Sequence, residues 1–134
     1  MQKHFQLRGT IDEIPETRDQ MLSFIRESCH NASQDYNLLV AVQEALANAI
    51  VHGCKNDLSQ IVHCRVECNE SAIAITVRDP GPGFDLASLP DPTSVENVAE
   101  EHGRGIFLLR SLMDEVCFED GGRQLQMRKL RRPA

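Results

Sequence analysis

Hydrophobic and polar residues recur with two different periods along this chain, and the changes of period mark its elements. Apolar residues three or four positions apart predict helices, whereas strict alternation predicts strands with one buried face. The helical period predicts a helix that begins near Ile14, a second that ends near Gly53, and a third that follows residue 103. Alternation predicts strands at 4–8, 61–68, 73–77, 114–118 and 123–130.

The same periods predict which side chains form the core. In the helices we expect buried positions at Met21, Leu22, Ile25, Cys29, Leu39, Val42, Leu46, Ile50, Ile106, Leu109, Leu112 and Met113. In the strands we expect them at Val62, Cys64, Val66, Cys68, Ile73, Ile75, Val77, Leu125 and Met127. Tight turns at 69–71 and 119–122 predict two antiparallel hairpins. Gly53 is expected to end its helix in a left-handed conformation.

The second helix carries an unusual polar stripe. Glu44, Asn48 and His52 recur every four residues, so they share one face beside the apolar one. Asn is a poor helix former, and its place in mid-helix calls for a reason. Two interpretations stand here: a solvated helix face, or a site that a ligand approaches across small alanines.

Asp79 continues the two-residue spacing of the apolar positions in the strand at 73–77, so its side chain should point to the core side of the sheet. A carboxylate in that position needs hydrogen-bond donors. It either accepts from N–H groups of the following turn or accepts from an amino group of a ligand. Gly81 and Gly83 follow at once and permit another body to come close. Parity alone does not choose between the two interpretations.

Residues 85–102 have no clear period and are rich in acidic residues and proline, which is typical of a lid or a disordered loop. Gly103-Arg104-Gly105 then opens the third helix. Free N–H groups, the positive end of the helix dipole and an arginine together make an anion site. The alternative is a loop-to-helix junction that simply requires glycine.

Length and composition limit the classes of protein to which this chain can belong. The 134 residues, 41% of them hydrophobic, indicate one domain over 1–134. No apolar run approaches the roughly 20 residues of a membrane span, and the first residues do not resemble a signal peptide. The five cysteines form no CxxC pair, which favours free thiols in a reducing, cytoplasmic location. His63 and Cys64 should point to opposite faces of a strand, so we expect no shared metal.

The charge is unevenly distributed. The net charge is −6, but residues 123–134 hold five of the fourteen basic residues and no acidic ones. The rest of the chain has nine basic residues against twenty acidic ones, which argues against general nucleic-acid binding. We expect the basic segment to be a solvated edge strand and not a binding arm.

Three motifs in this order carry a family resemblance: Glu44-x3-Asn48-x3-His52, Asp79-x-Gly81-x-Gly83 and Gly103-Arg104-Gly105. They resemble the nucleotide boxes of the gyrase, heat-shock-90, histidine-kinase and mismatch-repair ATPase superfamily. The likeness is greatest to its anti-sigma-factor serine/threonine kinases, which the segments at 91–97 and 112–116 also resemble. It covers about residues 5–130.

The resemblance implies the fold and a ligand. The fold is the Bergerat ATP-binding fold, an α/β (α+β) two-layer sandwich. It has a mixed, mostly antiparallel sheet with about three helices on one face, and a lid at about 84–102. ATP would lie between helices and sheet. Asp79 would accept from the adenine 6-amino group, and the backbone of Gly81 and Gly83 would meet the base and ribose.

At the phosphate end, the resemblance gives Asn48 as the Mg²⁺ ligand, since its amide oxygen suits a hard cation that also takes phosphate oxygens. Gly103 and Gly105 would present N–H groups to the phosphates, with Arg104 as a counter-charge. Glu44 would be the general base, one helical turn or about 6 Å from Asn48. His52 either helps to order the phosphate side or packs behind these groups, and the second is the expectation.

The implied activity is phosphorylation of a Ser or Thr on a small antagonist protein, which releases that partner in a partner-switching system. A sigma factor would be a further partner, and small relatives often form homodimers. The alternative is a nucleotide-gated regulator that sequesters a sigma factor without kinase activity. The chain holds no dimerising phosphoacceptor hairpin for a histidine kinase and no second domain with the lysine of a gyrase.

Two positions depart from the family pattern. The family often has Thr after the glycine that opens the last strand, where it supports the adenine-binding aspartate. Here Arg123 follows Gly122, so another group must take over that support. Ala47 stands where some of the kinases have a hydroxyl residue.

Overall fold

The computed structural model describes residues 1–29, 36–55, 57–81 and 101–131, with side chains for all of these except 101–104. Its centre is one five-stranded sheet of order β1-β2-β3-β5-β4, with every neighbouring pair antiparallel. The strands are β1 (Gln2–Arg8), β2 (Ile61–Cys68), β3 (Ala72–Arg78), β4 (Glu115–Glu119) and β5 (Gln124–Leu130).

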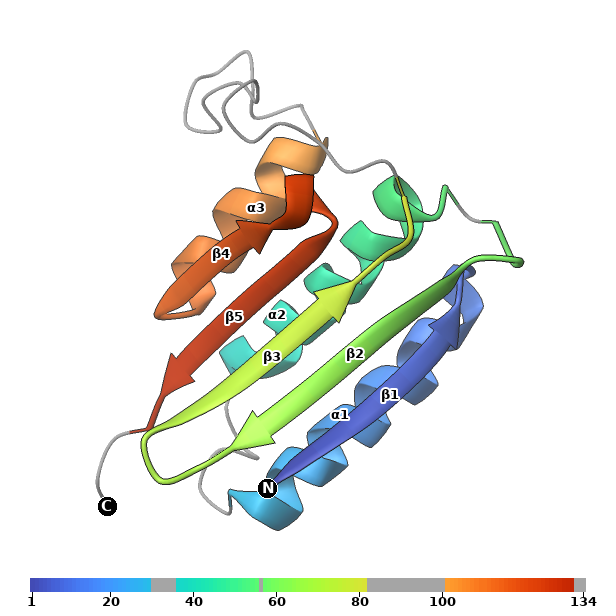
Figure 1. Cartoon of the computed structure of the whole chain (residues 1–134). Helices are drawn as coiled ribbons and strands as arrows, with labels where there is room; N and C mark the ends of the chain where they lie inside the picture. Colours follow the sequence, from blue (N-terminus) through green and yellow to red (C-terminus); the bar gives the residue numbers. More distant parts are fainter. Residues whose placement is uncertain (30–35, 56, 82–100, 132–134) are drawn as a thin grey trace.

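Three α-helices cover one face of this sheet (Figure 1). They are α1 (Ile14–Ser28), α2 (Tyr36–Asn48) and α3 (Glu101–Leu112). Helix α2 packs against both α1 and α3. The α+β two-layer architecture expected from the sequence is therefore confirmed, with a sheet that is antiparallel throughout in the described part of the chain.

Local sequence explains where the elements begin and turn. Pro15 lies in the first turn of α1, where its missing N–H is not needed. The β2–β3 hairpin turns on Asn69, whose Oδ1 accepts hydrogen bonds from the N–H groups of Ser71 and Ala72. The β4–β5 hairpin turns through Asp120–Gly122, a short 3-10 segment. Both hairpins predicted from the alternating pattern are present.

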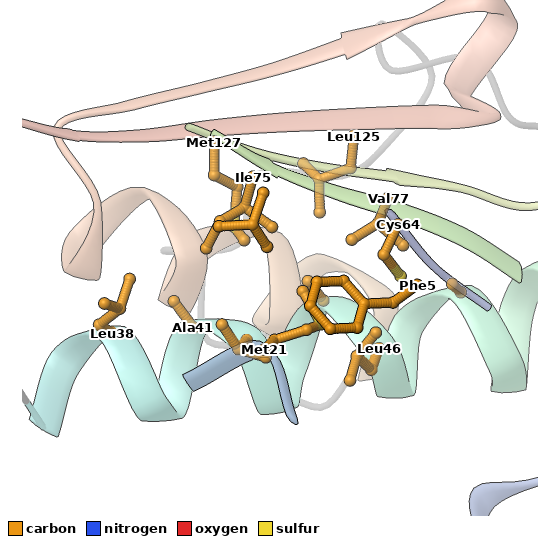
Figure 2. Packing of buried hydrophobic residues seen from close by; sticks show 14 of the residues in the cluster. Phe5, Met21, Leu38, Ala41, Leu46, Cys64, Ile75, Val77, Leu125 and Met127 are labelled. Carbon is orange, nitrogen blue, oxygen red and sulfur yellow. The ribbon is translucent and has the colours of Figure 1, made fainter. Parts of the chain in front are cut away.

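The core lies between the sheet and the helices (Figure 2). Side chains of α1 and α2, such as Met21 and Leu46, meet inward side chains of the sheet, such as Ile75 and Met127. The inward strand positions predicted from alternation are all buried. On the helices the predicted positions are buried as well, except for the partly buried Leu22 and Leu112 and for Leu39.

The prediction for Leu39 was wrong. Its side chain is 37% exposed, whereas the neighbouring Leu38 is 1% exposed and packs in the core. Leu38 lies four residues before Val42 and eight before Leu46, so these three share the buried face of α2. Leu39 lies one residue further round the helix and leaves that face.

The prediction of a basic edge strand was also wrong. The strand β5 lies between β3 and β4, and β1 and β4 form the two edges of the sheet. Leu125 and Met127 of β5 are buried, and Arg128 pairs across the ladder with Glu115 of β4 at 2.8 Å. Arg128 and Lys129 therefore belong to a central strand, and Arg123 and Arg131 flank it. Among the described helices, none has the length and apolar character to cross a membrane.

Candidate functional site

The polar stripe ends in a change of helix type. After Asn48 the α-helical pattern of α2 gives way to a π-helical turn over Ala49–Gly53, closed by a hydrogen bond from the N–H of Cys54 to the carbonyl of Ala49 at 2.9 Å. Such turns occur often at functional sites, because the inserted residue redirects the backbone. Here the turn brings Gly53 to the carboxyl end of β3.

Gly53, Asp79 and Gly81 form a tight junction at that end of the sheet. A Cβ on Gly53 would lie 2.3 Å from the Asp79 Cγ, and a Cβ on Gly81 would lie 2.2 Å from the Gly53 carbonyl oxygen. Both distances are far below any real contact, so only glycine fits at either position. The expected left-handed stop at Gly53 was wrong, since the positive φ here belongs to Lys55, at 52°.

The Asp79 carboxylate is half-buried at this junction. Its Oδ1 accepts a hydrogen bond from the Gly81 N–H at 2.8 Å, as the turn interpretation predicts. Burial raises the pKa of Asp79 above its ordinary value, while the Gly81 N–H and the nearby Arg123 and Arg78 guanidinium groups oppose that rise. The ionised Asp79 carboxylate at the end of β3 is therefore only partly solvated, which costs the folded state free energy.

The junction is also tied to the last strand. The backbone N–H of Asp79 donates to the Arg123 carbonyl at 3.0 Å, and the Arg123 Nε donates to the Gly81 carbonyl at 2.9 Å. Sequence reasoning noted Arg123 only as a departure from the family pattern. Its contact with Gly81 depends on the β3–β5 pairing, which periodicity does not reveal.

The other end of the polar stripe meets α3. A Cβ built on Gly105 would lie 3.6 Å from the Glu44 Oε2, an ordinary contact distance. Glu44 therefore borders the first turns of α3, and Gly53 borders Asp79. Asn48 lies between them on the same helix and, like Glu44, is partly exposed. The structure brings the described parts of the three sequence motifs to one edge of the molecule, where β3 and α2 end and α3 begins (Figure 1).

Some predicted positions are only partly described. Gly83 and residues 84–100 of the predicted lid lie outside the described residues, whereas 101 and 102 are already the start of α3. In a helix that begins at Glu101, Gly103 lies in the first turn, whose N–H groups have no helical partner. Gly105 lies just past that turn, where a Cβ would make only an ordinary contact with Glu44.

The polar stripe separates two different features of the site. The span from Glu44 to Gly53 is about 13 Å at the rise of a helix. Near Gly53 the carboxylate of Asp79 offers a hydrogen-bond acceptor. Near Glu44 lies the N-terminus of α3, and a helix N-terminus is suited to anions. A hollow of about 400 Å³ adjoins the junction and is lined by Gly53, Cys54, Lys55, Asp57, Gln60, Pro80 and Gly81. Asp79 is absent from that lining, so the hollow is a neighbour of the acceptor site.

Comparison with known proteins agrees with this geometry. The sequence matches the histidine kinase-like ATPase domain family over residues 7–129, which is nearly the whole chain. The chain belongs to this ATPase family. Its matched region contains Glu44, Asn48, Asp79 and the Gly103–Gly105 segment.

Named relatives place this ATPase domain in the anti-sigma-factor kinase branch. The chain is 28% identical to the anti-sigma F factor of Geobacillus stearothermophilus, over 87% of this chain and 81% of that protein. It is 30% identical to the anti-sigma F factor of Bacillus cereus, over 74% of this chain and 69% of that one. It is 35% identical to the serine-protein kinase RsbW of Bacillus licheniformis, over 69% and 62% of the two chains.

A solved structure shares the fold of this ATPase domain. The RsbU and RsbW domains of a Mycobacterium tuberculosis protein superpose with a TM-score of 0.63 at 18% identity. The match covers the whole of the present chain and 33% of that longer one. At this identity the likeness extends to the fold alone.

Proposed function

We propose that this protein is an ATP-dependent serine/threonine kinase of the anti-sigma-factor type. Its substrate would be a Ser or Thr on a small antagonist protein, in a partner-switching system. The observation that carries the proposal is the junction of Gly53, Asp79 and Gly81, with Glu44 and Asn48 on the adjoining helix. Membership of the ATPase family and the RsbW relative support it.

The junction supplies base recognition. The Asp79 Oδ1 is already held by the Gly81 N–H, so the carboxylate is oriented before any ligand arrives. A carboxylate accepts from the 6-amino group of adenine and is repelled by the carbonyl oxygen of guanine at the same place. The bare backbone at Gly53 and Gly81 leaves the carboxylate room that any Cβ would fill. Gly83 would extend this surface to the ribose.

The phosphate end uses α2 and α3. The N–H of Gly103, in the first turn of α3, and the cation of Arg104 would hold the phosphates, and Gly105 keeps the surface beside Glu44 open. Asn48 would hold Mg²⁺ through its amide oxygen, and the ion would neutralise charge on the transferred phosphoryl group. His52 is part of the π-helical turn and would pack behind these groups.

Glu44 would act as the general base. It stands one helical turn from Asn48, and its carboxylate borders Gly105. That position suits removal of the proton from a substrate hydroxyl near the bound phosphate. A positioned base of this kind contributes about 10²–10⁴-fold to a rate.

A second candidate function is nucleotide-gated sequestration of a sigma factor. Several relatives are named anti-sigma F factors, which favours a sigma factor as a binding partner. This function needs the nucleotide site but not the base, so Glu44 distinguishes the two. One protein can perform both, because release of the sigma factor and phosphorylation of the antagonist use the same nucleotide.

The test has two arms. In the first, calorimetry with ATP, ADP and GTP, with and without Mg²⁺, measures nucleotide binding to the parent and to Asp79→Asn, with Asp57→Asn as a control at an exposed carboxylate nearby. We expect adenine-selective binding that only Asp79→Asn abolishes. Unchanged affinity in Asp79→Asn would mean that Asp79 merely caps its turn.

In the second arm, γ-labelled ATP is incubated with the chain and with the proteins that co-purify with it. We expect label transfer by the parent and a loss of at least about 100-fold in Glu44→Gln, with ATP affinity kept. Transfer at the parent rate by Glu44→Gln would refute the base assignment. Nucleotide binding without any transfer by the parent would favour the sequestering regulator.

A further inference from the structure

Arg123 links two loops that meet beside the candidate base site. Its Nε donates to the Gly81 carbonyl at 2.9 Å, while its own carbonyl accepts from the Asp79 N–H at 3.0 Å. One residue, immediately before β5, thus holds the segment 79–81 at both ends. Asp79 and the Gly81 N–H that donates to its carboxylate both belong to the segment that these two hydrogen bonds hold.

The Arg123 side chain is itself fixed by the β4–β5 turn. Its Nη1 donates to the Asp120 carbonyl at 3.3 Å and lies 3.8 Å from the Asp120 Oδ1. The Asp120 carboxylate also pairs with Arg78 on β3. Three successive residues of the turn, Asp120, Gly121 and Gly122, have positive φ values of 52°, 64° and 88°. A non-glycine residue in this region is uncommon, so the turn holds Asp120 in place at some conformational cost.

Displacement of Gly81 would disturb the whole junction. The space where a Gly81 Cβ would stand is already filled by the Gly53 carbonyl, so the loop has one close-packed position against the π-helical turn. The β3–β5 ladder ends at the pair Arg78–Gln124, before the loop begins. The hydrogen bond from Arg123 to the Gly81 carbonyl connects the loop to the sheet past that end of the ladder. The Arg123 side chain is 39% exposed, which leaves it accessible and limits the strength of its electrostatic effect.

We propose that Arg123 is a positioning residue for the base end of the nucleotide site, acting through the Gly81 carbonyl on the orientation of Asp79. The inference rests on the proposed nucleotide-binding function. It assigns to a guanidinium at the end of the β4–β5 turn the support that related kinases often obtain from a threonine at the same position. The arginine side chain is longer than that of threonine and has several donors. It donates one hydrogen bond to the Gly81 carbonyl and another to the Asp120 carbonyl.

The experiment compares Arg123→Ala and Arg123→Lys with Arg128→Ala. Arg128 lies further along the chain on β5 and pairs with Glu115, away from the junction. Calorimetry with ADP and with GDP gives affinity and base preference, and amide hydrogen exchange at Gly81 in the nucleotide-free chain reports the loop itself. Neither measurement depends on kinase activity.

We expect Arg123→Ala to weaken ADP binding about tenfold, to narrow the preference for ADP over GDP, and to speed exchange at Gly81. Arg128→Ala should behave as the parent. Arg123→Lys keeps the charge but lacks the planar fork, so it should resemble Arg123→Ala.

Parent-like affinity and exchange in Arg123→Ala would overturn the inference and leave the proposed function standing. Full recovery in Arg123→Lys would also overturn it, because charge alone would then suffice. A parent chain that binds neither ADP nor ATP would remove the proposed function, and the inference with it.

Discussion

The Asp79 carboxylate is half-buried at the end of β3, and its burial raises its pKa above the ordinary value of 3.8. Between 3.8 and the raised value, the folded chain binds more protons at this site than the unfolded chain does. The free energy of unfolding therefore falls as pH rises through that window. Above the window the ionised carboxylate costs the folded state a constant amount.

Asp79→Asn should consequently stabilise the protein at neutral pH while it loses nucleotide affinity. The gain should be below about 1 kcal/mol, since solvent screens a half-buried charge, and it should vanish as the pH falls toward 3.8. Urea unfolding across a pH series measures it. Asp57→Asn should act in the opposite direction, because hydrogen bonds from Ser59 lower the pKa of Asp57. A less stable Asp79→Asn at neutral pH would contradict this account.

At the residue scale, the sequence revealed the positions whose chemistry is unusual for their place. Asn48 in mid-helix and Asp79 on an apolar strand face both violate local preference, and both lie at the candidate site. Gly53 and Arg123 were not identified in the same way. Their contacts are with Asp79 and Gly81, far along the chain, and only the packed sheet and helix bring them together.

At the scale of elements, periodicity predicted the type of each described helix and strand but not every phase or neighbour. Leu38 and Leu39 are adjacent and equally apolar, so the pattern at the start of α2 fits two rotations of the helix. Alternation likewise says which residues of β5 point inward but not which strands lie beside it. The turn at 119–122 predicts β4 as one neighbour of β5, but the place of β5 beside β3 follows from tertiary pairing alone.

The phase of α2 can be tested with a matched pair of substitutions. Leu38→Ala should destabilise the protein by about 2–5 kcal/mol, because it empties a fully buried position. Leu39→Ala should cost less than about 1 kcal/mol, since that side chain is 37% exposed. Urea midpoints of the two variants provide the comparison. Equal losses would place both leucines in the core and contradict the phase described here.

On the scale of the whole molecule, the burial of the cysteine side chains shows how well the helices and the sheet shield each other from solvent. Cys29, Cys54, Cys64 and Cys68 are buried and Cys117, on the edge strand β4, is exposed. Burial raises the pKa of Cys64 to about 12, and that of Cys68 also to about 12. Thiolate, the reactive form, is therefore scarce at both.

A thiol-reactive chromophore should label one cysteine per folded chain quickly and all five after unfolding in urea. Cys117→Ser should abolish the fast phase and leave the slow one unchanged. Absorbance against time measures both phases. More than one fast thiol in the parent would show that the layer of helices opens readily over the sheet.

The place of β5 within the sheet has a consequence for synthesis. Arg78 of β3 is paired with Gln124 of β5, 46 residues further along the chain. On the ribosome, β3 therefore leaves the exit tunnel with one bare hydrogen-bonding edge and must wait for its second neighbour. The loop at 79–81 therefore gains its hydrogen bond from Arg123 only after nearly all of the protein has been translated.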